Sequence, residues 1–139
     1  MLFQASSSLT RLPGRYLLTT RDQHLVTDSM KSRGGPGEAW SAGELLAGAL
    51  VSCCNALVES AATEKNIALD NLRIQASCEP DENKMGHYAY VRLEIFIDGP
   101  TPAQAEELVT VFTTVCPIYG SLTRGAPVTV QLNGKPFHG

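Results

Sequence analysis

The sequence predicts an α+β domain, in which an antiparallel sheet packs on a long central helix and on a second helix. The first observation behind this prediction is an amphipathic helical pattern from Ala42 to about Lys65. The second is a change to a period of two residues over Leu72–Glu79 and Tyr90–Ile97. The chain has 139 residues, of which 43% are hydrophobic, so we expect a single domain, residues 1–139, around one core.

The N-terminal part predicts a hairpin. Tyr16–Thr20 and His24–Thr27 are short and rich in β-forming residues, and Arg21–Gln23 lie between them as a turn. The segment Ser29–Trp40 contains three glycines and a proline, which interrupt regular structure. We therefore expect a flexible connection from the hairpin to the helix that follows.

The long helix has the clearest local signal in the chain. Ser41 and Glu44 fit a capping box, which predicts that the helix begins at Ala42. Asn66 can end the helix in the left-handed conformation. At 100° per residue one narrow stripe is polar, and it consists of Glu44, Gly48, Ser52, Asn55, Glu59 and Thr63. The opposite, apolar arc contains Leu46, Ala49, Leu50, Cys53, Leu57 and Ala61.

The second half of the chain predicts two paired strands, a helix and a last strand. Leu72–Glu79 and Tyr90–Ile97 should pair antiparallel across the turn segment Pro80–His87. A last strand is expected at Val128–Leu132, before the turn at Asn133 and Gly134.

The second helix is bounded by local signals. Thr101, Pro102 and Gln104 supply an N-cap, a proline at the first position and a second capping box. Its apolar face should contain Ala105, Leu108, Phe112 and Val115, and it should end near Cys116.

Composition and charge exclude several function classes. The net charge is −3 without a block of like charge, which argues against binding to nucleic acid or acidic membrane. The mostly apolar stretch Leu45–Val58 is 14 residues long, whereas a bilayer span needs about 20, so it predicts a buried helix. The N-terminus lacks the pattern of a signal peptide, which favours the cytoplasm. The three histidines show no ligand spacing, so we expect neither a metal nor a cofactor.

Four cysteines are the candidates for chemistry, and none lies in a C-x-x-C pair. Cys53 lies at the centre of the apolar arc, where a packed thiol and a reactive thiol are both reasonable. Cys116 precedes Pro117 and can be the N-cap of a short helix, Pro117–Leu122, whose N–H groups would favour a thiolate. Alternatively, Pro117 only terminates the preceding helix.

The other two cysteines are interpreted as packing residues. Cys54 is rotated 100° from Cys53 on the helix, and a disulfide between these neighbours would be strained. Cys78 belongs to the apolar face of its strand. Phe112 and Tyr119 either line a substrate pocket or belong to the core.

Three segments together resemble a known family. They are Gly34-Gly35, the run Ser41–Cys53 with the sequence SAGELLAGALVSC, and the distant Cys116-Pro117-Ile118-Tyr119. They resemble the superfamily of osmotically inducible protein C and organic hydroperoxide resistance proteins, nearer to its general branch. The resemblance covers about His24 to Leu132. It implies an intertwined homodimer with active sites at the interface, a peroxidatic Cys53 and a resolving Cys116.

The family also activates its thiol with an arginine that a glutamate holds. A count without gaps places that arginine at Arg33 and the glutamate at Gly43, which has no side chain. Arg15 and Arg21 are the alternatives for the arginine. Glu44 is the adjacent acid, but it lies roughly 13.5 Å from Cys53 along the helix axis, so it is either a helix cap or a group that steers Arg33.

The leading hypothesis is a thiol peroxidase that protects against oxidative stress. Cys53 would reduce an organic hydroperoxide, or hydrogen peroxide, and become a sulfenic acid; Cys116 would condense with it to a disulfide that an external dithiol reduces. Two alternatives remain. One is a dimeric protein of the same fold that binds a small ligand, and the other is a redox sensor that does not turn over.

Overall fold

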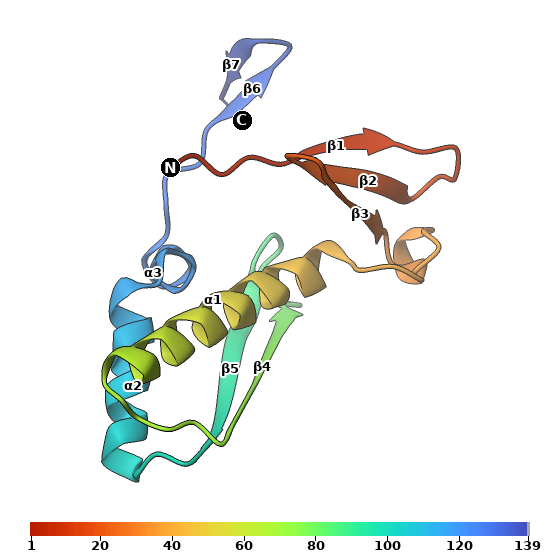
Figure 1. Ribbon diagram of the computed structural model, residues 1–139. Helices are drawn as coiled ribbons and strands as arrows, with labels where there is room; N and C mark the ends of the chain where they lie inside the picture. The colour runs from red at the N-terminus through yellow and green to blue at the C-terminus, as the bar shows by residue number, and fades with distance from the viewer. Residues whose placement is uncertain (139) are drawn as a thin grey trace. The chain divides into compact units, whose positions relative to one another are not determined.

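The computed structural model of the protein describes residues 1–138, which group into two units. The first unit contains residues 1–49 and 76–93, and the second contains residues 50–75 and those from 94 onward. Three long elements contribute residues to both units: α1 (Ala42–Glu64), β4 (Asn71–Pro80) and β5 (Tyr88–Asp98) (Figure 1). The α+β class predicted from the sequence is confirmed. That residues 1–139 are one domain stays a prediction.

The first unit begins with a three-stranded antiparallel sheet. Its strands β1 (Ser6–Leu9), β2 (Arg15–Thr20) and β3 (Gln23–Asp28) lie in sequence order. The predicted hairpin is confirmed, with Arg21 in the left-handed region at its turn. We did not predict β1, because its sequence SSSL has neither β-branched residues nor an alternating pattern and all four residues are exposed.

Residues 29–41 follow a defined backbone path rather than the flexible one we expected. A short 3₁₀ helix, η1 (Lys31–Arg33), ends at Gly34, whose φ of 81° requires a residue without a side chain. The buried carboxylate of Asp28 accepts hydrogen bonds from the backbone N–H groups of Glu38 and Ala39, at 3.0 and 2.9 Å. One buried carboxylate therefore fixes the end of the glycine-rich segment, which a local pattern does not reveal.

Helix α1 has the predicted limits. The Ser41 hydroxyl accepts from the Glu44 N–H at 3.3 Å, Glu44 Oε1 accepts from the Ser41 N–H at 3.4 Å, and Asn66 ends the helix with a φ of 54°. The buried stripe is different from the predicted arc, since its members are Leu50, Cys54, Val58, Ala61 and Ala62. Cys54 is completely buried and Cys53 is half-buried, so the centre of the apolar face was placed one residue too early.

By length and composition, α1 is also the one helix in residues 1–138 that could cross a membrane, although core helices of soluble proteins pass the same test. It is longer than the apolar stretch of 14 residues on which we based the prediction of a buried helix.

Strands β4 and β5 pair in a two-stranded sheet. Backbone hydrogen bonds join Asp70 to Asp98 at one end and Asp81 to His87 at the other, so the strands are antiparallel, as predicted.

Helix α2 (Pro102–Val115) begins with the predicted capping box at Thr101 and Gln104 and buries Leu108 and Phe112. Val115, which we placed on the buried face, is 55% exposed.

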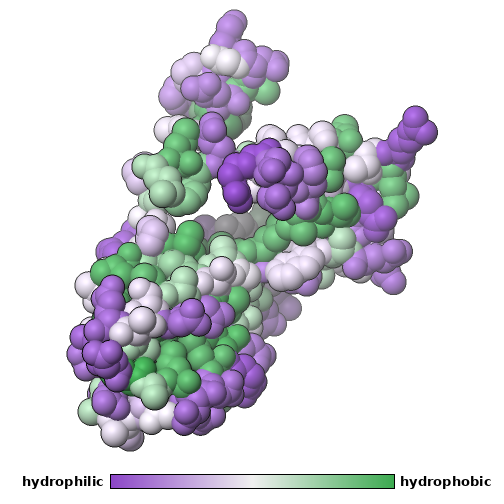
Figure 2. Space-filling model, in the orientation of Figure 1, coloured by the Kyte–Doolittle hydropathy of each residue, from purple (hydrophilic) through white to green (hydrophobic). Residues whose placement is uncertain are grey.

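The C-terminal elements are α3 (Pro117–Arg124), β6 (Val130–Leu132) and β7 (Lys135–Phe137). Strand β6 corresponds to the strand predicted at Val128–Leu132, but it begins two residues later. Strand β7 was not predicted, because its sequence KPF contains a proline and shows no alternation. Hydrophobic side chains remain at the surface of both units (Figure 2), among them Leu25, Trp40, Val115, Val130 and Phe137.

Candidate functional site

Cys53 and Cys116 are neighbours in the second unit, although they lie far apart in the sequence. Cys53 is half-buried on α1, and Cys116 is 3% exposed at the junction of α2 and α3. Burial raises the pKa of the Cys53 thiol to about 11, and the hydrogen bond and charge of Cys116 add to this rise. The Ile118 backbone N–H lowers the pKa. The fold thus brings together one accessible and one enclosed sulfur.

Cys116 ends one helix and begins the next. Its N–H donates to the Phe112 carbonyl at 3.0 Å, which closes α2, and its Sγ accepts from the Tyr119 N–H at 3.3 Å, which caps α3. Pro117 occupies the first position of α3, where no N–H is required. The prediction that Cys116 is the N-cap of a short helix is therefore confirmed, and the alternative, in which Pro117 only terminates the preceding helix, is wrong. The hydrogen bond directs the sulfur toward the start of α3.

Cys54 is enclosed beside this pair. It is completely buried, and burial, followed by the charges of Cys116 and Cys53, raises the pKa of its thiol to about 12. A thiol in such surroundings stays protonated, which fits the interpretation of Cys54 as a packing residue.

The Phe112 and Tyr119 rings lie 5.2 Å apart between their centroids, and Phe112 is a core residue at 1% exposure.

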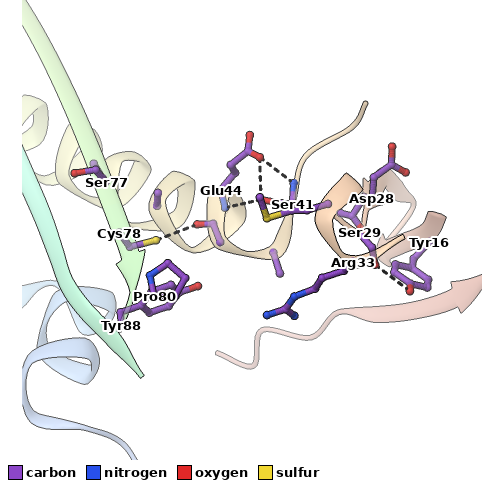
Figure 3. Close-up of a pocket in the computed structure, with 16 residues that line it drawn as sticks. Tyr16, Asp28, Ser29, Arg33, Ser41, Glu44, Ser77, Cys78, Pro80 and Tyr88 are labelled. Carbon is purple, nitrogen blue, oxygen red and sulfur yellow. Dashed lines mark hydrogen bonds between the residues drawn. The ribbon is translucent and has the colours of Figure 1, made fainter. Parts of the chain in front are cut away.

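The arginine that should activate Cys53 lies in the other unit. Within the described part of a single chain, no arginine or lysine contributes to the pKa of Cys53. Arg33 and Glu44 instead line a cavity of about 520 Å³ in the first unit (Figure 3). Around this cavity are also Tyr16, Ser29, Cys78 and Tyr88. Glu44 is engaged as a cap, since its Oε1 also accepts from the Ser41 hydroxyl at 2.8 Å.

The three candidate arginines differ in their partners. Arg15 donates through Nε and Nη2 to the two oxygens of Asp28, at 2.8 and 2.9 Å, and this pair holds the pKa of Asp28 well below its usual range. Arg21 lies exposed at the tip of the hairpin. Among the described residues, no carboxylate lies within ion-pair distance of Arg33. Arg33 is thus the candidate whose charge is available inside a cavity.

Gly43 faces the same cavity. A Cβ built at Gly43 would lie 3.3 Å from the Tyr88 hydroxyl and 4.0 Å from Cys78 Sγ. The position at which the gapless count expects an acid is therefore packed closely against the hydroxyl of Tyr88, with the Cys78 sulfur at van der Waals distance. Cys78 was predicted to be a packing residue, and no role was predicted for Tyr88. The alternation correctly placed Cys78 on the inner face of β4, but a strand pattern does not show that this face lines a cavity.

The family description OsmC-like protein matches residues 35–131. No curated protein matches the sequence.

Solved structures show the same fold. A Legionella pneumophila organic hydroperoxide resistance protein OsmC is 20% identical, with a TM-score of 0.72 and coverage of 90% of this chain and 91% of that one. An Elizabethkingia anophelis organic hydroperoxide resistance protein with thiocyanate bound is 20% identical, with a TM-score of 0.70 and coverage of 90% and 89%.

A third structure, of a Vibrio cholerae protein assigned to organic hydroperoxide resistance, has captopril bound in one of its active sites. It is 26% identical, with a TM-score of 0.68 and coverage of 99% of this chain and 96% of that one. The family match covers more than half of the chain, and these structures share its fold. The chain belongs to the OsmC-like protein family.

Proposed function

We propose that the protein is a cysteine-based thiol peroxidase that reduces organic hydroperoxides, and also hydrogen peroxide, in defence against oxidative stress. The observation that carries this proposal is the pairing of the half-buried Cys53 with the buried Cys116. Relatives named for organic hydroperoxide resistance support the choice of substrate. A cytoplasmic location, where thiols are kept reduced, suits a pair that must be reduced after each cycle.

The exposures of the two sulfurs suit different steps. Cys53, as a thiolate, attacks the distal oxygen of the peroxide; the O–O bond breaks, an alcohol leaves and Cys53 becomes a sulfenic acid. The Cys116 thiol then attacks the Cys53 sulfur, water leaves, and a disulfide forms. An external dithiol reduces the disulfide and restores both thiols. Because Cys116 is enclosed, the peroxide meets Cys53 first.

The first step requires a thiolate that a single chain does not supply. With a pKa of about 11, only about one Cys53 in 10,000 is ionised at pH 7. We propose that a homodimer lowers this pKa and that Arg33 of the second copy is the activating cation, because Arg33 lines a cavity and has no carboxylate partner within residues 1–138. Exposed apolar side chains such as Leu25 and Trp40 supply surface for the dimer to cover.

In this proposal Glu44 has a supporting part. Its carboxylate accepts hydrogen bonds from Ser41 at the start of α1, so it fixes the part of the helix that lines the same cavity as Arg33. Gly43 leaves Arg33 without the glutamate that the family resemblance implies, which keeps the guanidinium free for a thiolate.

Thiol counting tests the proposal. The reduced protein is mixed with cumene hydroperoxide, and free thiols are counted over time for the unchanged chain, Cys53→Ser and Cys116→Ser. We expect fast loss of two thiols per chain, a trapped sulfenic acid in Cys116→Ser and no fast loss in Cys53→Ser. Slow, unselective oxidation of all four thiols would contradict the peroxidase and favour a ligand-binding protein.

Turnover distinguishes the enzyme from a redox sensor. With a dithiol reductant in excess, the enzyme consumes many equivalents of cumene hydroperoxide per chain, whereas a sensor consumes one. Arg33→Ala should raise the Cys53 pKa and slow the first step, and Arg33→Lys should restore part of the rate because it retains the charge. An unchanged thiolate titration in Arg33→Ala would remove Arg33 from the site.

A further inference from the structure

Residues 29–39 form the loop that carries Arg33, and one buried carboxylate closes this Arg33 loop. Asp28 is the last residue of β3 and is 3% exposed. Its Oδ2 accepts from the backbone N–H groups of Glu38 and Ala39, at 3.0 and 2.9 Å. The carboxylate therefore ties the far end of the loop to the residue at which the loop begins.

The Arg33 loop packs closely on itself. The Arg33 N–H donates to the Met30 carbonyl at 2.9 Å, and the Gly37 N–H donates to the Ser29 carbonyl at 3.1 Å. A Cβ at Gly35 would overlap the Ser29 carbonyl. Because the loop has so little free length, the position of its arginine depends on how the loop is closed.

The closing carboxylate does not capture the arginine of the loop. Asp28 and Arg33 line the same cavity, but their charged groups point in different directions (Figure 3) and form no ion pair within the described residues. Arg15 instead donates to both carboxylate oxygens of Asp28, at 2.8 and 2.9 Å. Without Arg15, a bare carboxylate at the wall of the cavity would attract Arg33 and oppose a thiolate.

We propose that Arg15 and Asp28 are positioning residues for Arg33 in the activation of Cys53. Asp28 closes the Arg33 loop, and Arg15 neutralises Asp28, so that the Arg33 guanidinium is presented to Cys53 of the second copy. This inference rests on the proposed function. It gives Arg15, an alternative for the activating arginine, a different part, because Arg15 acts through Asp28 and does not contact the peroxide.

Closure of the loop is measured first, by limited trypsin digestion. Trypsin can cleave after Lys31 and Arg33 only when the loop opens. The test variant combines Arg15→Gln with Asp28→Ala and is called the alanine pair; both charges go together, so neither is left without its partner. We expect cleavage about tenfold faster than in the unchanged protein. Glu38→Gln is the matched control, since this exposed carboxylate lies 3.7 Å from Arg15, and its cleavage should be unchanged.

The thiolate titration of Cys53 is measured second, from alkylation by iodoacetamide at each pH. The alanine pair should lower the thiolate fraction at pH 7 at least about tenfold, as Arg33→Ala does. Adding the alanine pair to Arg33→Ala should have no further effect, because the pair acts through that arginine. Arg15→Gln with Asp28→Asn, the asparagine pair, retains an oxygen that can accept both N–H groups, so it should keep the closed loop and the titration of the unchanged protein.

The outcomes separate this inference from the proposed function. If Arg33→Ala leaves the Cys53 titration unchanged, the activating role of Arg33 fails and this inference with it. If Arg33→Ala raises the pKa and the alanine pair does not, only this inference fails. Additive effects, or a loss of activation in an asparagine pair with a closed loop, would also overturn it.

Two measurements cover the assembly and the folding of the variants. Light scattering should find the alanine pair in the same oligomeric state as the unchanged protein; a monomer would overturn the inference, because Asp28 would then act on the assembly. Hydrogen exchange of the unchanged protein needs no substitution. The amides of Glu38 and Ala39 should exchange as slowly as those paired between β2 and β3, and fast exchange would show that the carboxylate does not close the loop.

Discussion

Substitution of Cys116 by serine and by alanine separates its structural contribution from its chemical one. The Cys116 sulfur caps α3 by accepting from the Tyr119 N–H, and it also raises the pKa of Cys53. A serine hydroxyl can accept the same N–H, whereas an alanine cannot. Both variants remove the second thiol. The two proteins therefore differ in the cap and share the effect on Cys53.

The expected difference in stability follows from the cap. Loss of an N-cap side chain costs about 0.5 to 2 kcal/mol, so Cys116→Ala should unfold about 1 kcal/mol more easily than Cys116→Ser. Urea denaturation, followed by circular dichroism under reducing conditions, measures this difference. Equal stabilities, or a less stable serine variant, would show that the sulfur does not act as a cap.

The shared effect is a more reactive Cys53. Without Cys116 the pKa of Cys53 should fall below about 11, although not to its ordinary value, because burial is the larger cause of the rise. Each half unit of pKa gives about a threefold higher thiolate fraction at a pH below the pKa. The rate of alkylation by iodoacetamide at Cys53, followed by mass spectrometry as a function of pH, reports the shift. If neither variant lowers the pKa, the proximity of the two sulfurs is refuted.

Three other substitutions test the packing of the core, the Arg15–Asp28 ion pair and the cap of α2. Phe112→Ala should cost about 3 to 5 kcal/mol in urea unfolding, because the ring is buried in the second unit; a cost below 1 kcal/mol would contradict that burial. The hydrogen bond from Arg15 lowers the pKa of Asp28 in the folded state. The ion pair therefore stabilises the fold fully above the pKa that Asp28 has in the unfolded chain, and this stabilisation is lost as the pH falls below about 4. Asp28→Asn should remove this pH-dependent contribution. The free energy of unfolding, measured between pH 2 and 7, should then change less with pH than it does in the unchanged protein. Thr101→Ala should destabilise by about 1 kcal/mol through loss of the α2 cap, and an unchanged urea midpoint would show that the capping box contributes nothing.

Helix limits could be predicted because their causes are local. Ser41 and Glu44 satisfy N–H groups within one turn, and Thr101 with Gln104 does the same for α2. Asn66 ends α1 through its own backbone conformation. Each of these interactions joins residues that are close in the sequence, so a short pattern contains the whole interaction.

The short strands could not be predicted in this way. β1 and β7 form because each pairs with a neighbouring strand, and their own residues show no β-forming pattern. The path of residues 29–41 depends on Asp28, whose carboxylate reaches backbone groups ten and eleven residues ahead. Such long-range hydrogen bonds leave no periodic signal.

The candidate site shows the same division. The family resemblance, and not a local pattern, selected Cys53 and Cys116, and the structure brings them close together in the second unit. The helical pattern predicted the wrong one of two adjacent cysteines to be the buried one. Cys53 and Cys54 lie only 100° apart around the helix, and a broad apolar arc does not separate positions that close. Arg33 was named as the activating cation, and within one chain it lines the cavity that contains Cys78.

The amino-acid sequence by itself determined the helices with their caps, the long alternating strands and the family, since each depends on residues that are neighbours along the chain or on a run of matching residues. Only the tertiary structure decided which thiols meet and which arginine lines a cavity. Proximity across distant segments depends on how the elements pack, and packing places Cys116 against α1 and Arg33 in the cavity with Cys78.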